Sequence, residues 1–161
     1  MRREVPKVLG HNQLAATEQT REQITIRSAA ADYALEGIQA GSATDAERTE
    51  LRRQWLRDLQ WLGWAWTALT DYPAIIARYG KLSAVGALDD PALRQDDNAL
   101  LNLIRSLSWT GRALRDQQRQ HQAVKVFLDI SDLLKSRPQL KCNDRAKSDH
   151  DKRLCYFVGD V

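Results

Sequence analysis

Cysteine, histidine and long apolar runs are scarce in this chain of 161 residues. Two cysteines, Cys142 and Cys155, are too few to suggest a disulfide-stapled secreted domain. No apolar run approaches the roughly 20 residues that a membrane-spanning helix needs. The basic segment from Met1 to Lys7 leads into no apolar signal-peptide core. We therefore expect a cytoplasmic protein with no membrane partner.

The sequence also lacks the motifs of common catalytic sites. No glycine-rich loop carries the Lys and Ser/Thr that handle phosphate and magnesium, and no G-x-S-x-G nucleophile turn occurs. His121 and His150-Asp151 resemble the first ligands of HD-type phosphohydrolases, but no helix follows to present the last ligand. We expect no catalytic residue and no cofactor. The question of an enzyme stays open, because a site built from scattered residues leaves no motif in one sequence.

The C-terminal segment holds a second group of candidate metal ligands. Cys142, His150 and Cys155 are of the type that zinc prefers, and Asp144 or Asp149 is a candidate fourth ligand. Structural zinc sites normally bring two ligands close together, as in C-x2-C, and no such pair occurs here. We interpret these residues as free thiols and a surface histidine, and we expect no metal.

The composition is that of a globular protein, with 43% hydrophobic and 28% charged residues. The net charge of +3 is too small to indicate a polyanionic partner by itself. Seventeen of the 24 basic residues are Arg, which suits bidentate contacts to carboxylate or phosphate better than Lys does. Genomic base composition explains the same bias equally well, so this bias alone assigns no function.

Helical signals dominate the middle of the chain and predict an all-α fold, an irregular helical bundle of about four to six helices. We expect helices over about 17–39, 44–70 and 74–79, a loop with up to one short helix over 81–96, and a long helical pattern over 97–136 that bends or breaks near 117–122. The expected organisation is a poorly structured N-terminal arm (1–14), a helical domain (15–136) and a polar C-terminal tail (137–161) in which only the end has residues that could pack.

Polar residues mark several helix starts. Thr44 and Glu47 have the spacing of a capping box, in which each side chain bonds a free amide of the other residue. The acidic doublets Asp89-Asp90 and Asp96-Asp97 precede Pro91 and a helical pattern. We interpret these doublets as N-caps rather than as a magnesium site or a catalytic carboxylate pair.

The segment 51–66 contains four of the five tryptophans. Its apolar residues recur at helical spacing, and from residue 59 onward apolar residues fill the other faces as well. Such a helix is either the centre of a core or one side of an interface. We expect Trp61 and Trp66 to be buried at the centre, with Trp55 or Trp64 nearer the edge. The residues of the helical stripe are Leu51, Trp55, Leu59, Leu62, Trp66 and Leu69.

The candidate partner-binding site is an arginine stripe on the long helical pattern. Arg105, Arg112, Arg115 and Arg119 are spaced seven, three and four residues apart, which places them on one helix face. Trp109 lies at the edge of that face. Arginines beside an aromatic ring suit phosphate and base contacts in nucleic acids, and they also suit protein interfaces.

A second candidate segment runs from Asp32 through Glu36 and Gly37. With the surrounding helix, over about residues 21–60, it resembles the inhibitory helix of the small antitoxins that silence Fic-type AMP-transferases. That family has Ser or Thr four residues before a Glu followed by Gly or Asn, and position 32 is Asp here. The resemblance implies an inhibitor in which Glu36 enters the enzyme's nucleotide site and pairs with an Arg that holds the γ-phosphate.

Three hypotheses of function result. The preferred one is a non-enzymatic helical interaction protein, an inhibitor, regulator or adaptor of bacterial, phage or mobile-element type, which binds a protein partner through aromatic and arginine-rich helix faces. The alternative is nucleic-acid binding through the arginine stripe and the basic tail. The third is an enzyme with scattered site residues. A helix that is apolar on all sides also invites self-association, so a homo-oligomer stays open.

Overall fold

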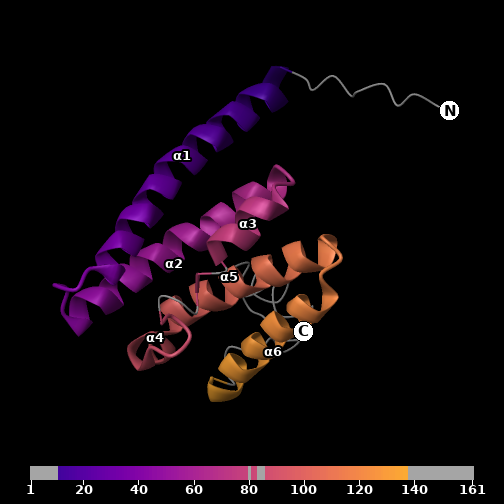
Figure 1. Ribbon diagram of the computed structural model, residues 1–161. Coiled ribbons are helices and arrows are strands. Elements are labelled where there is room, and N and C mark those ends of the chain that lie inside the picture. Colours follow the sequence, from indigo (N-terminus) through magenta and orange to yellow (C-terminus); the bar gives the residue numbers. More distant parts are fainter. Residues whose placement is uncertain (1–10, 80, 83–85, 138–161) are drawn as a thin grey trace, which may run out of the picture.

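The computed structural model describes residues 11–79, 81–82 and 86–137, and this part of the chain contains six helices and no strand (Figure 1). The all-α class and the helix number are therefore confirmed. Residues 1–10 of the expected arm (1–14) and residues 138–161 of the expected tail (137–161) lie outside the described residues. The helices are α1 (His11–Gln39), α2 (Asp45–Ala68), α3 (Tyr72–Tyr79), α4 (Pro91–Gln95), α5 (Asp97–Asp116) and α6 (Gln120–Ser136).

The helices form two antiparallel hairpins that meet through α2 and α5. Helix α1 packs on α2, and α5 packs on α6 (Figure 1). Helix α3 lies against both α2 and α5, and the short α4 contacts the same two helices. Helix α1 thus lies on the outside of the bundle, whereas α5 has neighbours on several sides.

Helix α5 is the centre of the fold. Thirteen of its 20 residues are buried, compared with seven of the 24 residues of the tryptophan-rich α2. Polar side chains in α5 tolerate burial because they bond their own helix: the hydroxyls of Ser106 and Thr110 donate to the carbonyls of Asn102 and Ser106 at 2.8 and 3.0 Å. Local hydroxyl bonding therefore lets a helix with a polar-looking sequence occupy the core.

The burial of the tryptophans of α2 follows the predicted helical stripe, since the two on the stripe are the two in the core. Trp55 and Trp66 are buried in the core, with 1% and 5% of their surface exposed. Trp64 is half exposed, as expected for a residue near the edge. The prediction for Trp61 was wrong, because this side chain is only partly buried and packs on the margin of the core.

The structure moves one helix start from its expected place and decides between the bend and the break that the sequence left open in the long helical pattern. Helix α1 begins at His11, inside the expected arm, rather than at Thr17. The long helical pattern is two helices, which meet at the polar turn 117–119. Gln118 adopts a positive φ of 58° in this turn, a conformation that ends a helix.

The expected caps are confirmed. The Thr44 hydroxyl accepts from the Glu47 amide at 3.2 Å, and the Thr44 amide donates to the Glu47 carboxylate at 2.7 Å. These bonds hold the pKa of Glu47 below its ordinary value. Asp90 caps α4 and Asp96 caps α5, each accepting from two backbone amides. The two acidic doublets thus supply the caps that the sequence predicts.

Gly111 sets the close approach of α5 and α6. A Cβ atom at this position would lie 2.7 Å from the Cε1 and Cζ atoms of Phe127. We expect Gly111→Ala to destabilise the protein by about 1–2 kcal/mol, because the ring must shift and the overpacking outweighs the better helix propensity of Ala. Urea unfolding measures the change. Gly41→Ala is the control, since no atom lies within 4 Å of its added Cβ. Equal stability of the two variants would contradict this account of the α5–α6 contact.

Candidate functional site

The arginine stripe is not a single helix face in the structure. Helix α5 ends at Asp116, so Arg119 lies outside it and precedes α6, where its guanidinium donates to Gln122. Arg119 lines an apolar pocket between α3, α5 and α6, whereas Arg105 lines a polar pocket between α2 and α5. Arg115 is exposed. Arg105 and Arg119 therefore line different pockets, and Arg119 does not share a helix with the other three arginines.

Trp109 is buried rather than at an exposed edge. Only 8% of its surface is exposed, and it belongs to the core cluster. The guanidinium carbon of Arg112 lies 5.7 Å from the centre of its ring, one helical turn further along α5. This cation–π contact occupies the ring with a residue of the same helix, so Trp109 does not present a free stacking surface.

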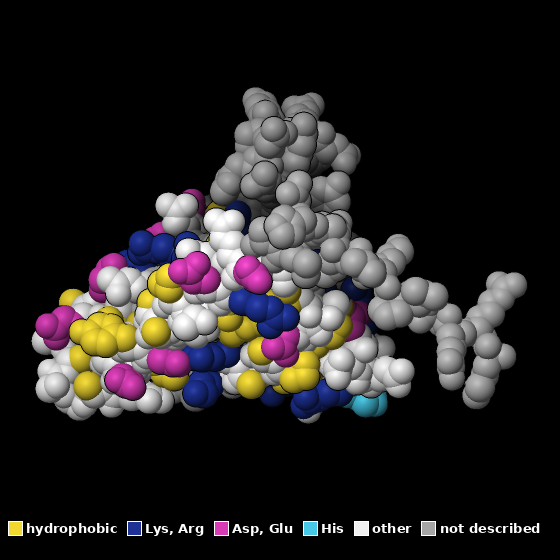
Figure 2. Space-filling model, turned by 90° about the horizontal axis from the view of Figure 1, so that it is seen from above, with side chains coloured by type: hydrophobic (Ala, Val, Ile, Leu, Met, Phe, Trp, Pro, Cys, Tyr) yellow, Lys and Arg dark blue, Asp and Glu magenta, His cyan; other side chains and the backbone are white. Residues whose placement is uncertain are grey.

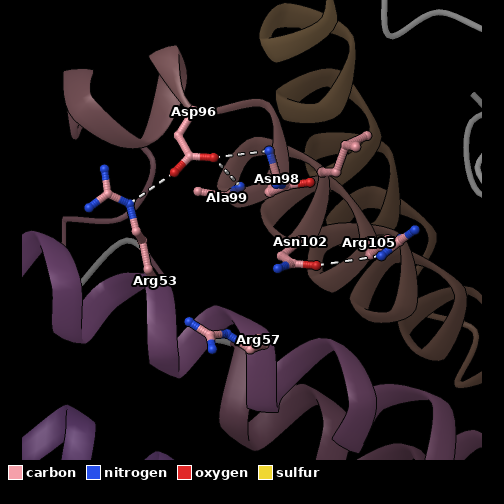
Figure 3. A pocket seen from close by; sticks show the side chains of 8 residues that line it. Arg53, Arg57, Asp96, Asn98, Ala99, Asn102 and Arg105 are labelled. Carbon is pink, nitrogen blue, oxygen red and sulfur yellow. Dashed lines mark hydrogen bonds and ion pairs between the residues drawn. The ribbon is translucent and has the colours of Figure 1, made fainter.

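A polar cavity with a volume of about 390 Å³ lies between α2 and α5. We call it the α2–α5 pocket. Arg53 and Arg57, which are four residues apart, line this pocket from α2 (Figure 3). Asn98, Asn102 and Arg105, with spacings of four and three residues, line it from α5. Its lining residues are Arg53, Arg57, Asp96, Asn98, Ala99, Leu101, Asn102 and Arg105.

The charges of the α2–α5 pocket are not balanced. Its lining contains three guanidinium groups and one carboxylate, a net charge of +2. Asp96 already accepts three hydrogen bonds, from the Asn98 and Ala99 amides at 3.0 and 3.1 Å and from Arg53 Nε at 3.1 Å. Arg53 also donates to a second carboxylate, that of Glu50, at 3.2 Å. Arg53 is thus neutralised within the fold.

Arg57 and Arg105 have no such partner in the part of the chain that the structure describes. Among the described residues, neither of them forms an ion pair with a carboxylate. Arg105 makes one long contact, from Nη1 to Asn102 Oδ1 at 3.5 Å (Figure 3), which is at the limit for a hydrogen bond. Burial lowers the pKa of Arg105 because desolvation disfavours its charge. Most guanidinium donors of these two residues are therefore available to an anion.

A second candidate is an aromatic surface on the α1–α2 hairpin, formed by Arg27, Asp58, Trp61 and Trp64. The ring centres of Trp61 and Trp64 are 5.8 Å apart and their planes are tilted by 55°. The Arg27 guanidinium carbon lies 4.7 Å from the centre of the Trp61 ring, and Arg27 Nη1 donates to Asp58 Oδ1 at 3.0 Å. Arg27 thus fixes Trp61, while Trp64 remains half exposed beside it.

On the face shown in Figure 2, charged side chains of both signs are mixed. Lys and Arg lie interspersed with Asp and Glu on the face in Figure 2, with no large region of one sign among the side chains that are described. Several pairs neutralise each other, such as Arg52 with Asp90 at 2.9 Å and Arg137 with Asp97 at 3.1 Å. The described side chains of this face therefore form no continuous basic stripe of the kind that tracks a phosphate backbone.

The segment that resembles the Fic antitoxin helix has structural contacts of its own. Asp32 pairs with Arg78 of α3, and Glu36 is exposed. A Cβ atom at Gly37 would lie 2.7 Å from Leu51 Cδ1. Position 32 therefore links α1 to α3, and the glycine allows α1 to approach α2, which gives both residues a role in packing.

No group of three or more His, Cys, Asp or Glu converges within the described ranges. The candidate zinc residues Cys142, His150 and Cys155 lie outside these ranges. None of the helices that the structure describes is long and apolar enough to cross a membrane.

No family model, curated protein or solved structure matches the chain. The α2–α5 pocket and the aromatic surface are therefore the features of the described part that bear on function. Sequence reasoning found Arg105 but missed Arg53, Arg57 and Arg27. The spacing of four between Arg53 and Arg57 was a visible signal, but only the packing of α2 on α5 shows that it faces Arg105.

Proposed function

We propose that this protein is a non-enzymatic interaction protein, a regulator or adaptor, that binds a protein partner through the aromatic surface of its α1–α2 hairpin. The observation that carries the proposal is Trp64, which is 50% exposed although it lies beside the fixed ring of Trp61. Exposing a large apolar ring is unfavourable in water, and covering it with a partner recovers that free energy.

The surroundings of Trp64 favour a protein partner. Trp and Arg are the residues that contribute most often to binding hot spots. The contacts of Arg27 with Trp61 and Asp58 hold one wall of the surface in place before binding. Such preorganisation reduces the entropy lost on association. Exposed hydrophobic side chains on α1, Ile26 and Tyr33, add further apolar area to the same hairpin.

Site-specific photo-crosslinking tests this proposal. A photoreactive phenylalanine analogue is placed at position 64 of the full chain and, as a matched control, at the exposed Gln54 of the same helix. We expect position 64, and not position 54, to crosslink one protein in stoichiometric yield in the native host. Trp64→Ala should abolish capture of that protein and leave the melting temperature within about 2 °C, because surface substitutions change stability little.

Two outcomes would contradict the proposal. Equal crosslinking from positions 54 and 64 would show that capture is nonspecific. Crosslinking of position 64 to nucleic acid instead of protein would favour the nucleic-acid alternative. Circular dichroism of each variant establishes that the fold is intact in these comparisons.

A further inference from the structure

The α2–α5 pocket is lined by two arginines, Arg57 and Arg105, that form no ion pair with a carboxylate among the described residues. Among the lining residues, Asp96 balances the charge of Arg53, so the net charge of +2 of the lining resides in Arg57 and Arg105. Arg105 is half buried, and a desolvated charge without a counter-charge is unfavourable. A fold that keeps such a residue gains stability when an anion enters.

Both walls of this pocket supply hydrogen-bond donors, and Asn102 lies between Arg57 and Arg105 (Figure 3). The Arg57 guanidinium comes from α2, whereas the Asn102 amide and the Arg105 guanidinium come from α5 (Figure 3). The cavity of about 390 Å³ lies between them. A guanidinium group binds an oxyanion best through two parallel N–H···O hydrogen bonds, so each guanidinium needs two oxygens of the anion.

We propose that the α2–α5 pocket is an anion-binding site for a phosphate monoester dianion, held by Arg57 and Arg105 with the Asn102 amide as a further donor. This site is separate from the aromatic surface and goes beyond the proposed function.

The charge and the geometry both favour a phosphate monoester. A net charge of +2 is balanced by a dianion, whereas a carboxylate or a phosphodiester carries a single negative charge. A single guanidinium group already occupies both oxygens of a planar carboxylate, which leaves none for the second guanidinium. A tetrahedral phosphate monoester presents three terminal oxygens, so it can accept from both walls at once.

Titration with inorganic phosphate at constant ionic strength tests the site in the full chain, with calorimetry and amide chemical shifts as readouts. We expect saturable binding at one site and shifts centred on Arg57, Asn102 and Arg105. The double variant Arg57→Ala with Arg105→Met should bind at least tenfold more weakly. The Met side chain retains the apolar part of the Arg105 stem, so the core is preserved.

The matched control removes two arginines elsewhere. Arg115→Ala with Arg119→Ala changes the net charge equally but lies outside the α2–α5 pocket, so its affinity for phosphate should stay within twofold. Equal weakening in both double variants would overturn the proposal in favour of a general charge effect. Absence of saturable binding to the native chain would also overturn it. Arg57→Ala alone keeps the test valid if the double variant does not fold, because Arg57 is exposed.

Three further probes distinguish the possible sources of the anion. A neutral peptide with one phosphoserine should compete with inorganic phosphate at the same residues. Acetate and dimethyl phosphate, both monoanions, should bind at least tenfold more weakly. Dimethyl phosphate that binds as tightly as inorganic phosphate would overturn the preference for a dianion and indicate a nucleic-acid backbone as the ligand. Acetate that binds as tightly would overturn it in favour of an acidic peptide.

Discussion

Trp55→Ala is expected to destabilise the protein by about 3–5 kcal/mol, the cost of truncating a large aromatic residue in a packed core. Only 1% of the Trp55 surface is exposed, and the ring is part of the central cluster shared with α5. Removing it deletes apolar contacts and leaves a cavity that the surrounding helices close only in part. Chemical denaturation followed by circular dichroism measures the loss.

Two variants serve as controls for Trp55. Trp64→Ala removes the same side chain from a half-exposed position of the same helix and should cost less than about 1 kcal/mol. Trp55→Phe should cost clearly less than Trp55→Ala, because it keeps most of the ring. It also removes the Trp55 Nε1 donor, which is buried and has no hydrogen-bond partner in the described part of the chain. Equal losses for Trp55→Ala and Trp64→Ala would show that α2 is not anchored through Trp55.

Asp90→Ala is expected to destabilise the protein by about 2–4 kcal/mol, because Asp90 combines a helix cap with a buried ion pair. Its Oδ1 accepts from the Ala92 and Leu93 amides at 2.9 and 3.4 Å. Its Oδ2 accepts from Thr49 Oγ1 and Arg52 Nη1 at 3.0 and 2.9 Å. The carboxylate thus ties the start of α4 to α2. Thermal and urea unfolding would both detect its loss.

The same residue predicts a pH dependence of stability. Burial alone would raise the pKa of Asp90, but its hydrogen bonds outweigh burial and hold the pKa below the ordinary value. A lowered pKa in the folded state means that this stabilisation is fully present above the pKa of the unfolded chain, about 3.9. It is lost as the pH falls through the lower folded value.

Asp90→Asn isolates the charge from the cap. The amide oxygen still accepts from the start of α4, but the side chain no longer titrates. The difference in stability between the native chain and this variant should therefore shrink as the pH is lowered from 6 to 3. A difference that stays constant over this range would contradict the assignment of Asp90 as a titrating, stabilising group.

The sequence predicted the helices well because capping and apolar spacing depend on residues that are close in sequence. Thr44 and Glu47 are three residues apart, and their capping box forms whatever the rest of the chain does. The apolar stripe of α2 likewise marks its buried face, and four of its members, Trp55, Leu59, Leu62 and Trp66, are in the core. The central position of α5 was missed, because its Ser106 and Thr110 are polar in sequence and satisfied only within the helix.

The candidate site was harder to predict, because it depends on partners distant in sequence. Trp61 is covered in part by Arg27 of another helix, and no spacing within α2 indicates this contact. Arg105 was assigned to a stripe with Arg119, yet the turn at 117–119 ends α5 before that residue. The opposition of Arg57 and Arg105 depends on how α2 packs on α5. Such contacts between helices were not derivable from one sequence.

The central position of α5 has a consequence for synthesis on the ribosome. Helices α1, α2 and α3 are made before α5, and both α2 and α3 pack against it in the finished fold. While translation proceeds from α3 to α5, the surfaces of α2 and α3 that α5 will cover face solvent or chaperones. An N-terminal fragment that stops before Asp97 lacks the helix with the most buried residues, so we expect it to fold only in part.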